Sequence, residues 1–122
     1  MVIFVYGSLR KGQYNHWGEL AHLGTTTMKG YKMCSLGGYP YVLPSLEEDE
    51  ITVDILEVVD KDTLTSIHNM ELGAGYTAFE TSVTYEGTNY DGLIYVHKYH
   101  KGQHEQVVGG DWCKFLKEEY AL

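Results

Sequence analysis

The chain has 122 residues, the usual size of one domain, and combines 43% hydrophobic with 21% charged residues. We therefore expect one globular domain over residues 1–122. Its formal net charge of −8 argues against nucleic-acid and anionic-membrane partners, since both need clustered Lys and Arg. A small-molecule ligand stays open, because a pocket can have a local field of its own.

Cysteine content and the first residues indicate a cellular compartment. Cys34 and Cys113 are the two cysteines, whereas a secreted disulfide-stabilised domain would carry more. The apolar residues 1–6 are too short for a signal peptide, and no stretch approaches a transmembrane length. These features predict a cytoplasmic protein whose cysteines remain thiols.

The first half of the chain predicts mainly strands. Residues 1–6 are continuously apolar, which is typical of a strand buried on both faces. Residues 15–23 could form a short helix with Asn15 as its N-cap. Residues 25–36 are rich in Thr and Tyr and should be extended, and residues 39–43 should form another strand after a glycine pair.

The middle of the chain predicts a strand followed by a helix. Residues 51–59 alternate and then change parity, so this strand should either contain a bulge or be covered on both faces. Residues 61–70 have apolar side chains at helical spacing, with Asp60 or Asp62 as the cap. Gly73 and Gly75 should end this helix.

The last third predicts a hairpin and a final helix. Residues 77–86 and 89–99 should be two strands joined around Gly87-Thr88. Asp111 should cap a helix with an apolar stripe. The order of elements predicts an α+β fold, with a curled sheet or small mixed β-barrel and the helices outside it.

The first strand ends abruptly in the sequence Tyr6-Gly7-Ser8-Leu9. Glycine permits a close ligand approach, and successive backbone N–H groups in such a turn can bind an anion. Arg10 and Lys11 would add positive charge nearby. An ordinary strand-to-turn exit is the alternative, because Gly-Ser turns are common.

The stretch Y-G-S-L-R-x-G-x-x-N-H resembles the opening signature of the γ-glutamylcyclotransferase-like superfamily. Two further segments are similar to family motifs: GGDWCKF at 109–115, which would open the last helix, and NYDGLIYV at 89–96. The resemblance implies a small mixed β-barrel with flanking helices. It also implies an enzyme that cyclises a γ-glutamyl group to 5-oxoproline and releases an amine or amino acid.

The resemblance implies site residues as well. The backbone amides of Gly7, Ser8 and Leu9, with Tyr6 beside them, would bind the γ-glutamyl substrate. A single carboxylate after the middle helix would act as general acid and base, and Glu71 is the candidate for it. One carboxylate suffices because the attacking amine belongs to the substrate and the leaving amine takes the same proton. No metal and no cofactor is expected, and the oligomeric state stays open.

This sequence also departs from the family pattern. Leu72-Gly73-Ala74 is inserted after Glu71, and Phe79-Glu80-Thr81 stands where the family usually has Tyr-x-Arg. Glu80 is therefore a second candidate for the acid/base. The departure also keeps a non-catalytic module that binds a small carboxylate as the alternative function.

Two other groups of residues could carry chemistry. His97, His100 and His104 have a spacing that could bind a metal, but no carboxylate or Cys has a matching spacing, so we expect none. Asn15 and His16 could support the mouth of the pocket, or be an N-cap followed by a surface histidine.

Overall fold

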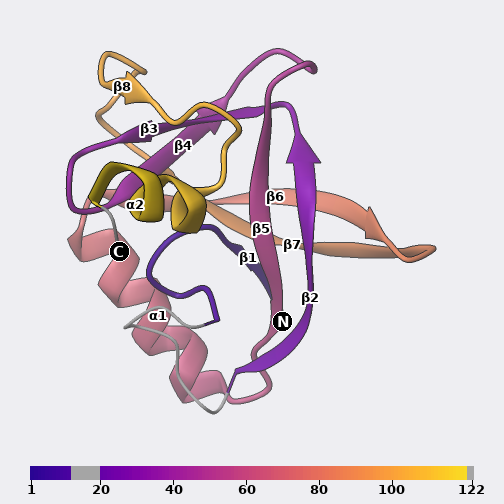
Figure 1. Ribbon diagram of the computed structural model, residues 1–122. Helices are drawn as coiled ribbons and strands as arrows, with labels where there is room; N and C mark the ends of the chain where they lie inside the picture. The colour runs from indigo at the N-terminus through magenta and orange to yellow at the C-terminus, as the bar shows by residue number, and fades with distance from the viewer. Residues whose placement is uncertain (12–19, 121–122) are drawn as a thin grey trace.

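The computed structural model describes residues 1–11 and 20–120 and shows an α+β fold (Figure 1). Two helices accompany two β-sheets in the described part of the chain. In chain order the elements are β1 Val2–Val5, β2 Ala21–Lys29, β3 Tyr31–Ser35, β4 Pro40–Pro44, β5 Glu50–Glu57, α1 Lys61–Gly73, β6 Tyr76–Tyr85, β7 Thr88–His97, β8 Glu105–Gln106 and α2 Trp112–Tyr120.

The larger sheet has the strand order β2-β5-β1-β7-β6, so β1 lies at its centre. This strand pairs with β5 antiparallel and with β7 parallel. The smaller sheet has the order β4-β3-β8. Because β1 has neighbours on both sides, the turn that follows it starts from the middle of the fold.

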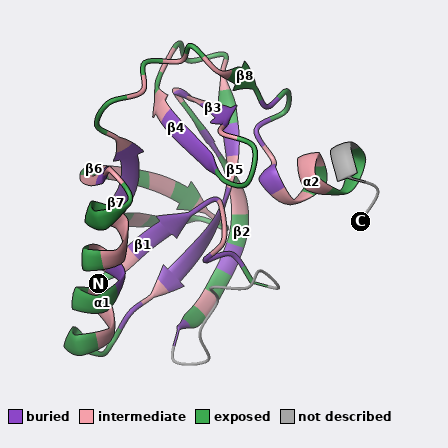
Figure 2. Cartoon of the chain, turned by 90° about the vertical axis from the view of Figure 1, so that its left-hand side faces the viewer, coloured by how far each residue is buried: buried purple, intermediate pink, exposed green. Residues whose placement is uncertain are grey.

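Strand β1 is buried on both faces, as its unbroken apolar sequence predicts. Ile3 and Val5 pack into one hydrophobic cluster, which also contains Ile67 of α1. Phe4 faces the other cluster, which contains Trp112 of α2. Helix α1 thus packs on one face of the sheet with its outer side exposed, whereas α2 contacts the other face through Trp112 and then projects away from the sheet (Figure 2).

Strand β5 is covered on both faces, which explains its change of parity. Ile51, Val53 and Ile55 face the cluster with α2, whereas Leu56 faces the cluster with α1. The irregularity in pairing lies in the neighbouring strand β2, between His22 and Gly24. Of the two alternatives for this segment, coverage on both faces is the one that the structure shows.

The barrel that the sequence predicted is not confirmed, because the described strands form two sheets that do not close into one. The larger sheet does curl, since its edge strands β2 and β6 approach each other. The ring of Tyr85 on β6 fills the space where a Cβ at Gly24 of β2 would lie. An aromatic side chain between the two edges takes the place of the backbone pairing that closure requires.

The prediction of a helix over residues 15–23 is wrong for residues 21–23, which form the start of β2. Residues 12–19, with Asn15 and His16, lie outside the described residues, whereas 21–23 belong to β2. The pairing of β2 with β5 starts at Ala21 opposite Glu57. A ladder along a long strand outweighs the weak propensity of a short helix.

The other predicted elements are confirmed with small shifts, except that the extended segment 25–36 is divided at Gly30 into β2 and β3, which belong to different sheets. Asp60 is the N-cap of α1, and its carboxylate accepts hydrogen bonds from the backbone N–H groups of Asp62 and Thr63. The turn between β6 and β7 is Glu86-Gly87, one residue earlier than predicted. Both residues have positive φ, 49° and 79°, as a tight hairpin turn requires.

Candidate active site

The site begins at the turn after β1. The backbone N–H of Arg10 donates a hydrogen bond to the carbonyl oxygen of Gly7 at 3.0 Å, which folds residues 7–10 back on themselves. Leu9 is buried at 3% exposure and anchors the turn in the cluster around α1. Packing of Leu9 holds the backbone of Gly7 and Ser8 along the wall of a cavity.

This cavity has a volume of about 310 Å³, enough for a small molecule. Its walls come from the end of β1 and the turn after it, the end of α1, the start of β4 with the residue before it, and the strands β6 and β7. The lining residues are Val5, Tyr6, Gly7, Ser8, Leu9, Tyr39, Pro40, Met70, Glu71, Ala74, Tyr76 and Tyr95. The five site residues that the family resemblance implies, Tyr6, Gly7, Ser8, Leu9 and Glu71, line the same cavity. Their roles stay predictions.

Glu71 reaches the cavity from the last turn of α1. Ile67, one turn earlier on the same side of the helix, is fully buried and fixes that side against β1. Ala74 then ends the helix, and Gly75, at φ 95°, turns the chain into β6. Glu71 lies one turn after Ile67 on the same side of α1. This side packs on the sheet at Ile67 and faces the cavity at Glu71.

Burial raises the pKa of the Glu71 carboxyl to about 7. Three tyrosines lie close enough to respond to its charge. Burial and then the Glu71 carboxylate raise the pKa of Tyr95 to about 12. The pKa values of Tyr6 and Tyr76 are raised by burial, with Glu71 as a further cause. The site thus holds one carboxyl that titrates near neutral pH beside phenols that stay protonated.

The three phenols also fix the shape of the cavity. The Tyr6 hydroxyl donates to the carbonyl oxygen of Tyr95 at 2.6 Å, and the Tyr76 hydroxyl donates to the carbonyl oxygen of Pro40 at 2.5 Å. The Tyr95 hydroxyl lies 3.2 Å from Nδ1 of His68. The sequence did not single out Tyr76 or His68, because these contacts join elements that are distant in the chain.

Arg10 does not face this cavity, and its expected role as a nearby cation for a ligand is wrong. Its guanidinium is buried and forms ion pairs with Asp54 at 3.4 Å and Asp111 at 3.0 Å. Asp54, 1% exposed, also accepts hydrogen bonds from the Lys11 backbone N–H and the Thr25 hydroxyl. A buried cation needs such partners. The charge of Arg10 therefore stabilises the turn through these ion pairs and does not serve a ligand in the cavity.

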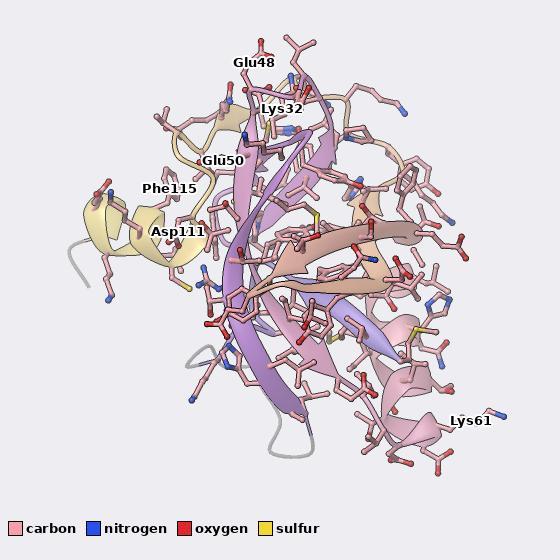
Figure 3. The ribbon with its side chains drawn as sticks, turned by 90° about the vertical axis from the view of Figure 1, so that its right-hand side faces the viewer. Lys32, Glu48, Glu50, Lys61, Asp111 and Phe115 are labelled. Carbon is pink, nitrogen blue, oxygen red and sulfur yellow. The ribbon has the colours of Figure 1, made fainter. Side chains whose placement is uncertain are left out.

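Asp111 is also the N-cap of α2, since its carboxylate accepts a hydrogen bond from the Lys114 backbone N–H. Figure 3 shows Asp111 where this helix begins and Phe115 on the helix beyond it. Arg10 belongs to the family-like stretch that starts at Tyr6, and Asp111 belongs to the family-like stretch at 109–115. The ion pair between them therefore joins two motifs from opposite ends of the chain.

The other candidates lie apart from Glu71. Glu80 lines a second cavity with Met1 and Asp91, so the structure does not bring it to the turn after β1. His97 stacks on His100 with ring centroids 4.1 Å apart, and His104 lies 2.9 Å from the Tyr41 hydroxyl. Within residues 1–11 and 20–120, no group of three or more His, Cys, Asp or Glu side chains is arranged to hold a metal ion.

Two further observations concern the cysteines and the length of the helices. No disulfide joins Cys34 and Cys113, which are both thiols, as the sequence predicted. No helix in the described part of the chain is long and apolar enough to span a membrane.

Comparison with known proteins identifies the family. The sequence profile of the family described as "Gamma-glutamyl cyclotransferase, AIG2-like" matches residues 3–114. The γ-glutamylcyclotransferase family protein YtfP of Escherichia coli K12 is 31% identical over 114 residues, which are 92% of this chain and 96% of YtfP. The chain therefore belongs to the AIG2-like γ-glutamylcyclotransferase family.

Solved structures support the same assignment. The crystal structure of the uncharacterized protein PH0828 from Pyrococcus horikoshii matches with a TM-score of 0.78 and 27% identity, covering 99% of this chain and 97% of that one. An AIG2-like protein from Mus musculus matches with a TM-score of 0.68 and 22% identity, covering 87% and 86%. At that identity the second match shows the fold.

Proposed function

We propose that the protein is a γ-glutamylcyclotransferase that converts a γ-glutamyl amine or γ-glutamyl amino acid to 5-oxoproline and the free amine. The observation that supports this most directly is that Glu71 and the turn Gly7–Leu9 line one cavity of about 310 Å³. A carboxyl with a pKa of about 7 can both take and return a proton near neutral pH. Membership of the family points to the same chemistry.

In the proposed reaction the substrate's own α-amine is the nucleophile. Glu71 removes one proton from the α-ammonium, and the freed nitrogen attacks the γ-carbonyl carbon to form the five-membered ring. The bond between this carbon and the leaving nitrogen then breaks, and Glu71 returns the proton to that nitrogen. The ring nitrogen still carries two hydrogens after the attack and loses the second proton to the leaving amine through solvent. The products are therefore 5-oxoproline and the amine in its ammonium form, and no other reactant is needed.

The turn Gly7–Leu9 has the second role in this proposal. Its backbone N–H groups bind the γ-glutamyl group, with Tyr6 beside it, and fold the substrate so that the amine reaches its own γ-carbonyl. The Tyr6 ring is held by its hydrogen bond to the Tyr95 carbonyl. The ion pair between Arg10 and Asp54, which lies outside the cavity lining, keeps the turn in place.

The test is release of 5-oxoproline from a panel of γ-glutamyl amines and γ-glutamyl amino acids. Glu71→Gln keeps the size of the side chain but removes its charge, so turnover should fall by roughly 10²-fold or more. Glu118→Gln, at an exposed position of α2, is the matched control and should keep full activity.

Two results would contradict the proposal. Full activity of Glu71→Gln would exclude Glu71 as the acid/base. Measurable binding of γ-glutamyl compounds without turnover by the wild-type protein would favour the alternative, a module that binds a small carboxylate.

A further inference from the structure

His68 lies behind Tyr95 as seen from the cavity. Nδ1 of His68 is 3.2 Å from the Tyr95 hydroxyl oxygen, and the two rings are 5.9 Å apart between centroids. Tyr95 lines the cavity, whereas His68 is not among the residues that do. Both His68 and Glu71 belong to α1 and are three residues apart, so they lie on one side of this helix.

The Tyr95 hydroxyl differs from the hydroxyls of Tyr6 and Tyr76 in the kind of hydrogen-bond partner that it has. Tyr6 and Tyr76 give their hydroxyl hydrogens to backbone carbonyl oxygens. The partner of Tyr95 is instead an imidazole nitrogen, which accepts a hydrogen bond in one tautomer and donates it in the other. Tyr95 keeps its proton at neutral pH, because burial and Glu71 raise its pKa to about 12.

The direction of the Tyr95 hydrogen therefore depends on His68. If Nδ1 accepts, the phenol hydrogen points away from the cavity. If Nδ1 carries a hydrogen and donates it to the Tyr95 oxygen, the phenol hydrogen is free to point into the cavity. Only the second arrangement gives a ligand in the cavity a phenol donor, and the imidazole N–H strengthens that donor by polarising it.

We propose that His68 is a positioning residue that donates its Nδ1 hydrogen to Tyr95 and so directs the Tyr95 hydroxyl toward the γ-carbonyl oxygen of the substrate. This inference rests on the proposed function. As the α-amine attacks, that oxygen gains negative charge, and a donor already aimed at it stabilises the charge most in the transition state. Tyr95 and the turn Gly7–Leu9 then act on the substrate from different walls of one cavity.

Three variants test the proposal by steady-state kinetics on the best γ-glutamyl substrate. Tyr95→Phe removes the donor, and His68→Leu removes the group that directs it, so each should lower kcat by about 10-fold or more with little change in KM. His68→Asn places an amide nitrogen near the position of Nδ1 and should recover a large part of the loss. Asn69→Leu, at the exposed neighbouring position, is the control and should keep wild-type kcat.

A double variant separates a positioning role from a general effect on structure. If His68 acts through Tyr95, adding His68→Leu to Tyr95→Phe should lower kcat by less than about 2-fold further. An undiminished effect of His68→Leu in the Tyr95→Phe background would overturn the proposal. Wild-type kcat in His68→Leu would do the same. Both results leave Glu71 and the proposed function intact.

A measurement without substrate checks the contact itself. Protein labelled with ¹³Cζ-tyrosine should show a Tyr95 resonance, assigned by its loss in Tyr95→Phe, that moves in His68→Leu and stays in place in Asn69→Leu. An unmoved resonance would mean that His68 does not bond to Tyr95, and would overturn the proposal. If the resonance moves but the wild-type protein turns over no γ-glutamyl compound, the proposed function fails, and the catalytic use of Tyr95 fails with it.

Discussion

Arg10 and Asp111 are separated by 101 residues in the chain, yet the guanidinium Nη1 lies 3.0 Å from the carboxylate Oδ1. Arg10 follows the turn that lines the cavity, and Asp111 is the N-cap of α2. Asp54 contacts the same guanidinium from β5. The turn is thus tied to two distant elements through one buried cation.

Removal of Asp54 should therefore destabilise the fold strongly. Asp54→Ala leaves the Arg10 guanidinium buried with one of its two carboxylates missing, and it removes the acceptor of the Lys11 backbone N–H. The expected loss is about 3–5 kcal/mol in the free energy of unfolding, measured by urea denaturation.

The matched control for this prediction is an ion pair on the surface. Glu118 and Lys114 are 4.0 Å apart with both side chains largely exposed. Glu118→Ala should change the free energy of unfolding by less than about 0.5 kcal/mol. Equal losses in the Asp54 and Glu118 variants would contradict a structural role for the buried pair.

This network shows what the sequence could and could not reveal. Asp54 interrupts an apolar strand, and a buried carboxylate in such a place indicates a cationic partner. The sequence does not say which cation, because that depends on how the turn after β1 meets β5. From the sequence alone, Arg10 is expected to add positive charge beside the turn for a ligand, whereas its guanidinium binds Asp54 and Asp111.

The helices and strands were largely predictable, because each depends on residues that are close together in the sequence. A cap at Asp60 or Asp62, the end of α1 at the following glycines and the buried strand β1 all follow from residues close together in the chain, and the structure shows Asp60 as the cap. The ring of phenols around Glu71 was not predictable in the same way. Its members come from β6, β7 and the end of β1, and only tertiary packing brings them together.

Activity should depend on pH through Glu71. The carboxyl must be ionised to accept a proton from the substrate, and its pKa is about 7. The quantity kcat/KM should therefore rise about tenfold per pH unit well below 7 and level off above it. The profile should be measured from pH 5 to pH 9. An inflection near pH 4.5, the ordinary value for a glutamate, would contradict the effect of burial.

The same pKa predicts how Glu71→Gln changes stability. The folded protein holds the Glu71 proton up to about pH 7, whereas the unfolded chain releases it near the ordinary value of 4.5. The folded state binds more protons in this window, so the contribution of Glu71 to stability falls as pH rises through it. Gln does not titrate, so the Glu71→Gln variant does not lose this contribution to the free energy of unfolding as pH rises. Its stability relative to wild type should increase by up to about 3 kcal/mol between pH 4 and pH 8, as measured by urea denaturation at each pH.

The glycine pair before α2 offers a test of close packing. Gly109 and Gly110 both have positive φ, 86° and 68°. A Cβ at Gly110 would overlap the backbone of Glu50 and Ile51, whereas a Cβ at Gly109 would meet open space. Gly109→Ala should cost about 1 kcal/mol from the backbone conformation, and Gly110→Ala clearly more. Equal melting temperatures for the two variants would show that the contact with β5 has no effect.

The last prediction concerns the wall of the cavity. A Cβ at Gly7 would lie 3.2 Å from Cγ of Pro40, and Pro40 also accepts the hydrogen bond of Tyr76. Gly7→Ala should therefore push Pro40 and Tyr76 apart from the turn and raise KM for a γ-glutamyl substrate by about 5-fold or more, with a loss of stability of about 1 kcal/mol. Gly38→Ala is the control, because a Cβ there meets nothing within 4 Å and its φ is not in the left-handed region. An unchanged KM in Gly7→Ala would mean that the substrate does not contact this part of the turn, and the role of the Gly7–Leu9 amides would then have to be abandoned.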